Sequence, residues 1–356
     1  MFQCVRNSLF AAVLITTGLG FFALNVQAQE EPDDEVEQAT ESHGARGDLV
    51  IYSARNEQLI KPLFDAYEKD TGVRIKFITA KEGPLLERLK AEGRKTRADL
   101  LITVDAGNLW QAAQSGLLAK VDSKQLNKNI PAYLRDPDGR WYGLSVRART
   151  IVYNTGKVKP AELSTYAALG DAKWKKRLCL RSSKSVYNQS LVAMMIASQG
   201  EPKTEAIIKS WMPNLAAPVF SDDENLLDAM AAGQCDVGIV NSYYFGREKR
   251  KHPDLPIGIF WANQEGRGTH VNISGAGVTK YAKHPQAAVK FLEWLSSAEA
   301  QNLFADKNLE FPANPTVKPD PLVTSWGDFK HDNINVSEAG KLQAKAVMLM
   351  DRAGYK

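Results

Sequence analysis

DLVIYSARNEQLIKPLFDAYEKDTGVRIKFITAKEGPLLERLKAEGRKTRADLLITVDAGNLW, residues 48–110, is the stretch that decides the fold. An apolar strand at 48–52 precedes a helix whose apolar residues recur at helical spacing until Thr71-Gly72 ends it. The alternation then continues as strand, helix, strand and helix at 73–77, 84–92, 98–104 and from Asn108 or Leu109. Strands that alternate with helices in this way predict an α/β domain with a mainly parallel sheet.

A second α/β set lies further along the chain, between two strand-like runs at 141–154 and 271–278. Its predicted strands and helices are 178–181, 186–198, 204–211, 224–232 and 235–240. We interpret the two flanking runs as crossings between lobes, after which a helix at 285–296 returns to the first lobe. A chain of 356 residues is long enough for two domains. We therefore expect two α/β lobes, each with a mainly parallel sheet flanked by helices, and two interlobe crossings. The predicted N-terminal lobe is 47–147 plus 276–314, and the predicted C-terminal lobe is 148–275 plus 315–356.

The first 28 residues have the pattern of an export signal, with Arg6 before an apolar run at 9–24 and small residues at 26–28. The alternative is a membrane anchor, but the run is shorter than the ~20 apolar residues that span a bilayer. We expect cleavage after Ala28. Residues 29–46 should then form an acidic flexible linker, because seven of the twelve residues at 30–41 are acidic and none is basic.

Composition favours a globular protein, with 44% hydrophobic and 24% charged residues and a mean hydropathy of −0.32. The formal charge is +4 and becomes +3 without residues 1–28, so the body that follows the acidic segment carries about +10. That charge suits anionic ligands, although ordinary solubility explains it equally well. The basic residues do not gather into a stripe with aromatics, so we expect no nucleic-acid partner.

Two cysteines, Cys179 and Cys235, follow the signal segment, and each begins a β-like apolar run. Export permits a disulfide between them if the two strands are neighbours, and two buried free thiols are the alternative.

Unusual polar residues gather directly after predicted strands, where ligands collect in open α/β sheets. These positions are 53–57, 145–149, 182–188 and 241–244. The chain has no Gly-x-Ser-x-Gly, His-Glu-x-x-His or Gly-x-x-x-x-Gly-Lys motif, and its five histidines lack metal-ligand spacing. Tyr187, Tyr243 and Tyr244 stand out, because three phenolates would neutralise a hard trivalent cation such as Fe³⁺. Aromatic packing is the alternative role for these side chains.

The runs 51–55, 98–110, 181–190 and 241–244 resemble bacterial periplasmic ferric-ion-binding proteins, and the resemblance covers essentially the whole mature chain. It implies a two-lobed periplasmic-binding-protein fold that carries Fe³⁺ to an inner-membrane ABC permease and its ATPase. It also implies that Tyr187, Tyr243 and Tyr244 are iron ligands. Cys179 and Cys235 match a disulfide pair of the most similar branch.

One position departs from that branch, which often has His-Tyr after the Ser-x-Arg turn where this chain has Asn56-Glu57. Glu57 is a candidate carboxylate ligand, and a first-turn residue at a helix N-terminus is the alternative. Arg55 and Arg147 are candidates to hold a synergistic anion such as carbonate, with salt bridges as the alternative.

The sequence therefore predicts a monomeric, non-enzymatic Fe³⁺-binding protein of the periplasm. An exported enzyme on the same scaffold is the alternative from another class, with a cysteine as its expected nucleophile. A binder of an organic anion or an iron chelate is the third possibility.

Overall fold

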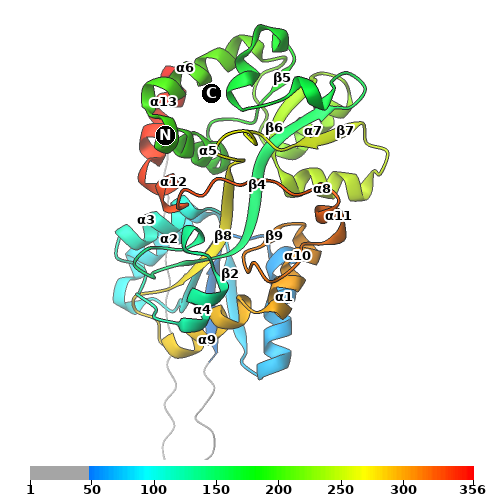
Figure 1. The fold of residues 1–356 in the computed structure, drawn as a ribbon. Helices are drawn as coiled ribbons and strands as arrows, with labels where there is room; N and C mark the ends of the chain where they lie inside the picture. The colour runs from blue at the N-terminus through cyan, green and yellow to red at the C-terminus, as the bar shows by residue number, and fades with distance from the viewer. Residues whose placement is uncertain (1–47) are drawn as a thin grey trace, which may run out of the picture. The chain divides into compact units, whose positions relative to one another are not determined.

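The computed structural model describes residues 48–356, apart from the side chains of residues 305 and 306. The predicted signal peptide, its cleavage after Ala28 and the predicted linker at 29–46 lie outside the described residues. The described part forms two lobes joined by long strands (Figure 1).

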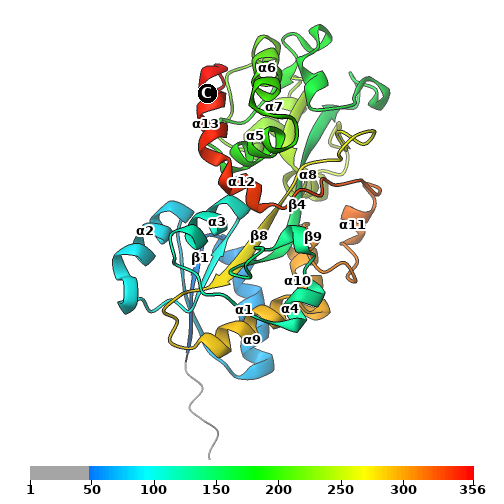
Figure 2. The same cartoon turned by 60° about the vertical axis from the view of Figure 1, so that its left-hand side comes forward.

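The N-terminal lobe is built on three parallel strands in the order β2-β1-β3, with helices on both faces (Figures 1 and 2). Its strands are β1 (Leu49–Ser53), β2 (Ile75–Thr79) and β3 (Leu100–Thr103). Its helices are α1 (Glu57–Thr71), α2 (Glu82–Glu92), α3 (Ala106–Gln114), α4 (Lys124–Asn129), α9 (Pro285–Leu295) and α10 (Ala298–Asn308). The predicted first helix is confirmed. It ends where Gly72 takes the left-handed conformation, with φ of 68°.

The C-terminal lobe is built around the parallel pair β5 (Leu178–Cys179) and β6 (Val237–Asn241). A further strand, β7 (Ile257–Phe260), completes its sheet. Its helices are α5 (Val186–Gln199), α6 (Glu201–Trp211), α7 (Asp223–Ala231), α8 (Ser242–Lys251) and α13 (Gln343–Arg352). The tail of the chain packs in this lobe, because Leu349 and Tyr355 belong to its core.

Two long strands, β4 (Tyr142–Asn154) and β8 (Val271–Val278), run between the lobes, as the sequence predicts. They pair antiparallel over 142–148, and β4 then pairs with β6 and β7 from Arg149 onward. Both sheets are therefore mixed, because the crossing strands oppose the parallel strands of each lobe. The lobe boundaries at 147/148, 275/276 and 314/315 stay a prediction.

Three short elements lie near the junction of the lobes: β9 (Phe311–Pro312), α11 (Pro321–Thr324) and α12 (Ser337–Lys341). Strand β9 pairs with β4, and α12 packs between α3 and α5. Six short 3₁₀ helices occupy 93–95, 132–134, 160–162, 167–170, 172–174 and 212–214 of the described chain.

A disulfide joins Cys179 to Cys235, with Cα atoms 5.9 Å apart, so the alternative of two free thiols is wrong. It closes a loop across a sequence separation of 56 residues. In the chain-entropy account, a loop of this length stabilises the fold by about 4 kcal/mol. The bridge joins the last residue of β5 to the segment directly before β6, and both strands lead to the tyrosines. None of the helices within residues 48–356 is both long and apolar enough to span a bilayer.

Candidate metal site in the interlobe cleft

A cleft of about 840 Å³ opens between the lobes. The N-terminal lobe contributes the segments 54–57 and 79–84, and the C-terminal lobe contributes 184–187 together with Tyr243 and Tyr244. All the predicted site residues other than the disulfide line this cleft: Arg55, Glu57, Arg147, Tyr187, Tyr243 and Tyr244. Arg55 and Tyr244, which are 189 positions apart in the sequence, thus meet around one space.

The three tyrosines lie in the first turns of two helices. The sequence analysis placed Tyr187 at the start of a predicted helix, and Tyr243 and Tyr244 directly after a predicted strand. Tyr187 is the second residue of α5, and Tyr243 and Tyr244 follow Ser242 at the start of α8. Ser185 caps α5, accepting a 3.3 Å hydrogen bond from the Tyr187 backbone, whereas Asn241 precedes α8 without a side-chain capping hydrogen bond. The positive ends of both helix dipoles therefore face the cleft and favour phenolate charge there.

The phenol groups converge on one another. The Tyr243 hydroxyl donates to the Tyr187 hydroxyl oxygen across 3.4 Å, and the rings of Tyr243 and Tyr244 are 4.3 Å apart. Two oxygens bound at right angles to one small octahedral cation lie roughly 2.9 Å apart, because each metal–oxygen bond is about 2.0–2.1 Å long. The Tyr187 and Tyr243 oxygens thus need only a small shift to share an ion.

Burial suppresses ionisation of these phenols. It raises the pKa of Tyr187 to about 12, with a further contribution from Tyr244. Burial also raises the pKa of Tyr243 and of Tyr244 well above the ordinary value. All three are therefore protonated at neutral pH, and a cation must displace their protons in order to bind.

Arginines surround the tyrosine rings. The guanidinium carbon of Arg181 is 5.3 Å from the ring centre of Tyr187, and that of Arg247 is 4.9 Å from Tyr243 and 5.8 Å from Tyr244. The sequence analysis gave neither arginine a ligand role. Arg247 lies four residues after Tyr243 on α8, so the helical spacing places it on the same face. These cations stabilise negative charge that develops on the phenol oxygens.

Arg55 and Arg147, the predicted anion holders, are both paired with a buried carboxylate. Glu310 accepts from Nη2 of Arg55 at 3.2 Å and lies 3.5 Å from Nη2 of Arg147, and it also accepts from Ser145. Burial alone would raise the pKa of Glu310, but Arg55 and Arg147 outweigh it and lower that pKa to about 2. Arg55 and Arg147 thus already hold a carboxylate of the protein itself. They form the salt bridges that the sequence analysis gave as their alternative role. An added carbonate would share these arginines with Glu310.

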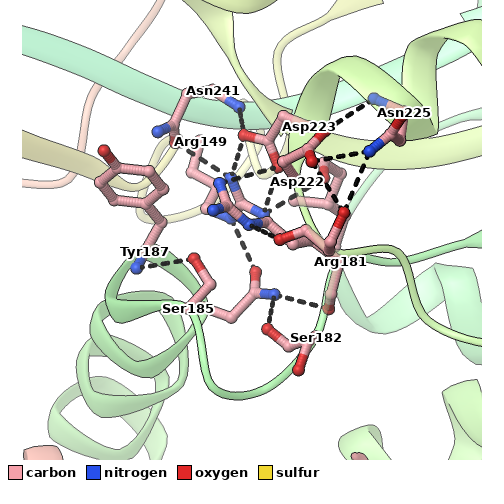
Figure 3. A network of polar contacts seen from close by, with 12 residues as sticks. Arg149, Arg181, Ser182, Ser185, Tyr187, Asp222, Asp223, Asn225 and Asn241 are labelled. Atoms are coloured by element: carbon pink, nitrogen blue, oxygen red, sulfur yellow. Dashed lines mark hydrogen bonds and ion pairs between the residues drawn. The ribbon is translucent and has the colours of Figure 1, made fainter.

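A second buried ion pair ties the two tyrosine-bearing helices together (Figure 3). Arg149 donates through Nη1 to Asp223 at 2.9 Å and through Nε to Asn188 of α5 at 2.8 Å. Asp223 also accepts from the backbone N–H of Asn241 at 3.0 Å, directly before α8. Figure 3 shows the Tyr187 ring beside Arg149, whose guanidinium carbon lies 6.0 Å from the ring centre, with the hydroxyl directed away from the network. Arg149 and Asp223 therefore fix the helix starts and leave the phenol free to face the cleft.

Two acidic residues begin helices on the opposite wall. Glu57 begins α1 and is exposed, and Glu82 begins α2 and is half-buried. Burial raises the pKa of Glu82, whose carboxylate also interacts with backbone N–H groups and with Arg147. The sequence analysis missed Glu82. This residue follows the predicted strand at 73–77, and polar residues after other predicted strands were selected as site candidates for that reason. Within residues 48–356, His, Cys, Asp and Glu side chains form no group of three that could hold a metal ion.

The two lobes, the crossing strands and the polar cleft define a class of protein, the two-lobed solute binder. Residues 62–331 match the bacterial extracellular solute-binding protein family, and this chain belongs to that family.

Relatives and solved structures agree with this assignment. The chain is 40% identical to iron uptake protein A1 of Synechocystis sp. over 92% of each chain. A solved Trichodesmium protein in complex with iron and citrate is 45% identical, with a TM-score of 0.84 over 87% of this chain and 100% of that one. The ferric binding protein from Campylobacter jejuni is 36% identical, with a TM-score of 0.82 over 87% and 100%.

Proposed function

We propose that this protein captures Fe³⁺ in the interlobe cleft through the phenolates of Tyr187, Tyr243 and Tyr244. The observation that carries the proposal is the convergence of three buried phenols, two of them 3.4 Å apart, at two helix N-termini. Phenolate oxygen is a hard ligand, and three such charges neutralise a trivalent ion. The relatives named for iron support the same cargo.

The protein then works in the periplasm as the monomeric soluble component of an ABC importer. It closes its lobes around the ion, docks on an inner-membrane permease with its ATPase, and opens to release the ion. The exported-enzyme alternative loses its expected nucleophile, because Cys179 and Cys235 are joined in a disulfide. We accordingly propose no catalytic residues.

A small iron chelate is the second candidate cargo. The cleft of about 840 Å³ exceeds the space that a single ion needs, and the Trichodesmium relative was solved with iron and citrate. A carbonate ion or an organic acid could fill the coordination positions that the protein leaves open.

Loading apo protein with Fe³⁺ should produce a visible phenolate-to-iron charge-transfer band. Titration with Fe³⁺, with ferric citrate and with citrate alone, followed by absorption and by calorimetry, separates the cargoes. A bare-ion site gives the band with any weakly held iron source. Citrate that binds without iron and without a band would favour the organic-anion alternative.

Iron affinity should fall steeply as pH falls, because each phenol that coordinates must release a proton. Every phenol that ionises on binding contributes about a tenfold change in affinity per pH unit, so three give about a thousandfold. Competition against a chelator of known pH dependence, between pH 6 and 8, measures the slope. A slope near zero would contradict phenolate coordination.

Without iron the same phenols affect stability only at high pH. In the folded protein the pKa of Tyr187 is raised to about 12. The stability that its neutral phenol contributes is therefore fully present below about pH 10, the ordinary pKa of a phenol. That contribution is lost as pH rises through 12, because the unfolded chain ionises first.

A further inference from the structure

We propose that Glu82, rather than Glu57, is the carboxylate with which the N-terminal lobe binds the ion opposite the tyrosines. This inference rests on the proposed function and assigns a ligand to the wall of the cleft that carries no tyrosine.

Three acidic side chains from this wall line the cleft: Glu57, Glu82 and Glu310. Glu310 is buried and committed to Arg55, Arg147 and Ser145, so binding a cation would break two ion pairs. Glu57 is exposed to solvent. A carboxylate in water is stabilised by hydration, and it must lose that hydration before it can bind an ion in a cleft.

Glu82 lies within electrostatic reach of the tyrosine cluster. Its side chain lines the same cleft as Tyr187, Tyr243 and Arg147, from the opposite wall. The Arg147 guanidinium in turn lies 5.8 Å from the ring centre of Tyr243. Glu82, Arg147, Tyr187 and Tyr243 thus surround one volume, which the two lobes share.

The charges of these groups are suited to a trivalent ion. Three phenolates balance Fe³⁺. Arg55 and Arg147 carry two positive charges against the one negative charge of Glu310, so one positive charge is left to balance Glu82. A carboxylate is a hard oxygen donor, so it matches the phenolates in ligand type. The space beside the next residue, Gly83, is also open, since an added Cβ there would meet no atom within 4 Å.

If Glu82 is a ligand, binding of the ion would also favour closure of the two lobes. The tyrosines all belong to the C-terminal lobe, so they alone could bind iron with the cleft open. A carboxylate from α2 lets the ion bridge the lobes, which makes the closed form depend on cargo.

The test is a matched pair of variants, Glu82→Gln and Glu57→Gln, in the full mature protein. Each removes one carboxylate charge from the first turn of a helix on the same wall. We expect Glu82→Gln to weaken Fe³⁺ binding by about 10- to 100-fold or more, since loss of outer-sphere partners alone costs that much. We expect Glu57→Gln to stay within about twofold of wild type, because an exposed charge at a helix N-terminus stabilises the helix rather than the bound ion.

Electron paramagnetic resonance of the bound high-spin Fe³⁺ provides a readout that a merely structural role would not move. The spectrum should change in Glu82→Gln and remain as wild type in Glu57→Gln, while both keep the visible phenolate band. Wild-type affinity and spectrum in Glu82→Gln would overturn the inference and leave the tyrosine site standing. If Glu57→Gln lost more Fe³⁺ affinity than Glu82→Gln, Glu57 would be the carboxylate ligand and the inference would be wrong. Absence of the band in iron-loaded wild type would remove the proposed function itself, and this inference with it.

Discussion

Tyr243→Phe, Tyr187→Phe and Tyr244→Phe should each weaken Fe³⁺ binding by about 100-fold or more and shift or bleach the visible band. Each substitution keeps the ring and its packing and removes only the oxygen. The loss should exceed the 10- to 100-fold cost of removing groups that act through a ligand, because here the ligand itself is removed. Equilibrium competition with citrate, followed at the charge-transfer band, measures the change.

Tyr281→Phe is the matched control, because Tyr281 lies outside the cleft beside Arg94. It should bind iron as wild type does. Thermal unfolding of the apo proteins checks that the three cleft variants remain folded. If two of the three retained full affinity and colour, the tyrosine site would be wrong, and the organic-anion alternative would become the better explanation.

Asp223→Ala should destabilise the protein by about 3–5 kcal/mol and also weaken iron binding. The substitution leaves Arg149 buried without its carboxylate, and an unpaired buried charge is costly. The side chains of Arg149 and Asp223 are only 1% and 0% exposed, so water cannot replace the lost partner. The backbone of Asn241 also loses its acceptor, which loosens the start of α8, where Tyr243 and Tyr244 lie.

Asp65→Ala provides the contrast, since Asp65 pairs with Lys61 on the surface of α1. That exposed pair, four residues apart on one helix, should contribute little to stability, because water screens the two charges. Urea unfolding of the three proteins gives the stabilities. A change below about 1 kcal/mol in Asp223→Ala would show that the buried pair does not hold the helix starts.

The sequence pattern predicted most of the fold because the elements are strongly periodic. The crossing strand at 271–278 and the helix that ends at Gly72 were placed correctly from apolar runs and a stop signal. Strand direction could not be predicted in this way, because an apolar run looks the same in parallel and antiparallel pairs. The mixed character of both sheets follows from the antiparallel pairing of β8 with β3 and of β4 with β6.

The site was predicted in part. Tyr187, Tyr243 and Tyr244 were found because they follow strands, but their place in the first helical turns depends on how soon after those strands α5 and α8 begin. The partner of Arg55 was not predictable from local pattern. Glu310 lies 255 residues away in sequence and reaches the arginines only through the tertiary fold.

The pairing of β3 with β8 also constrains the order in which the protein can fold. Leu100 lies beside Val278, so the N-terminal lobe completes its sheet with a strand that arrives about 170 residues later in the chain. Contacts this distant in sequence are slow to form because a long loop must close first. The first hundred residues of the folded body therefore cannot mature as an independent unit. A nascent or translocating chain exposes the edge of β3 until the second crossing strand emerges, and a truncation before residue 271 should yield an aggregation-prone fragment rather than a folded lobe.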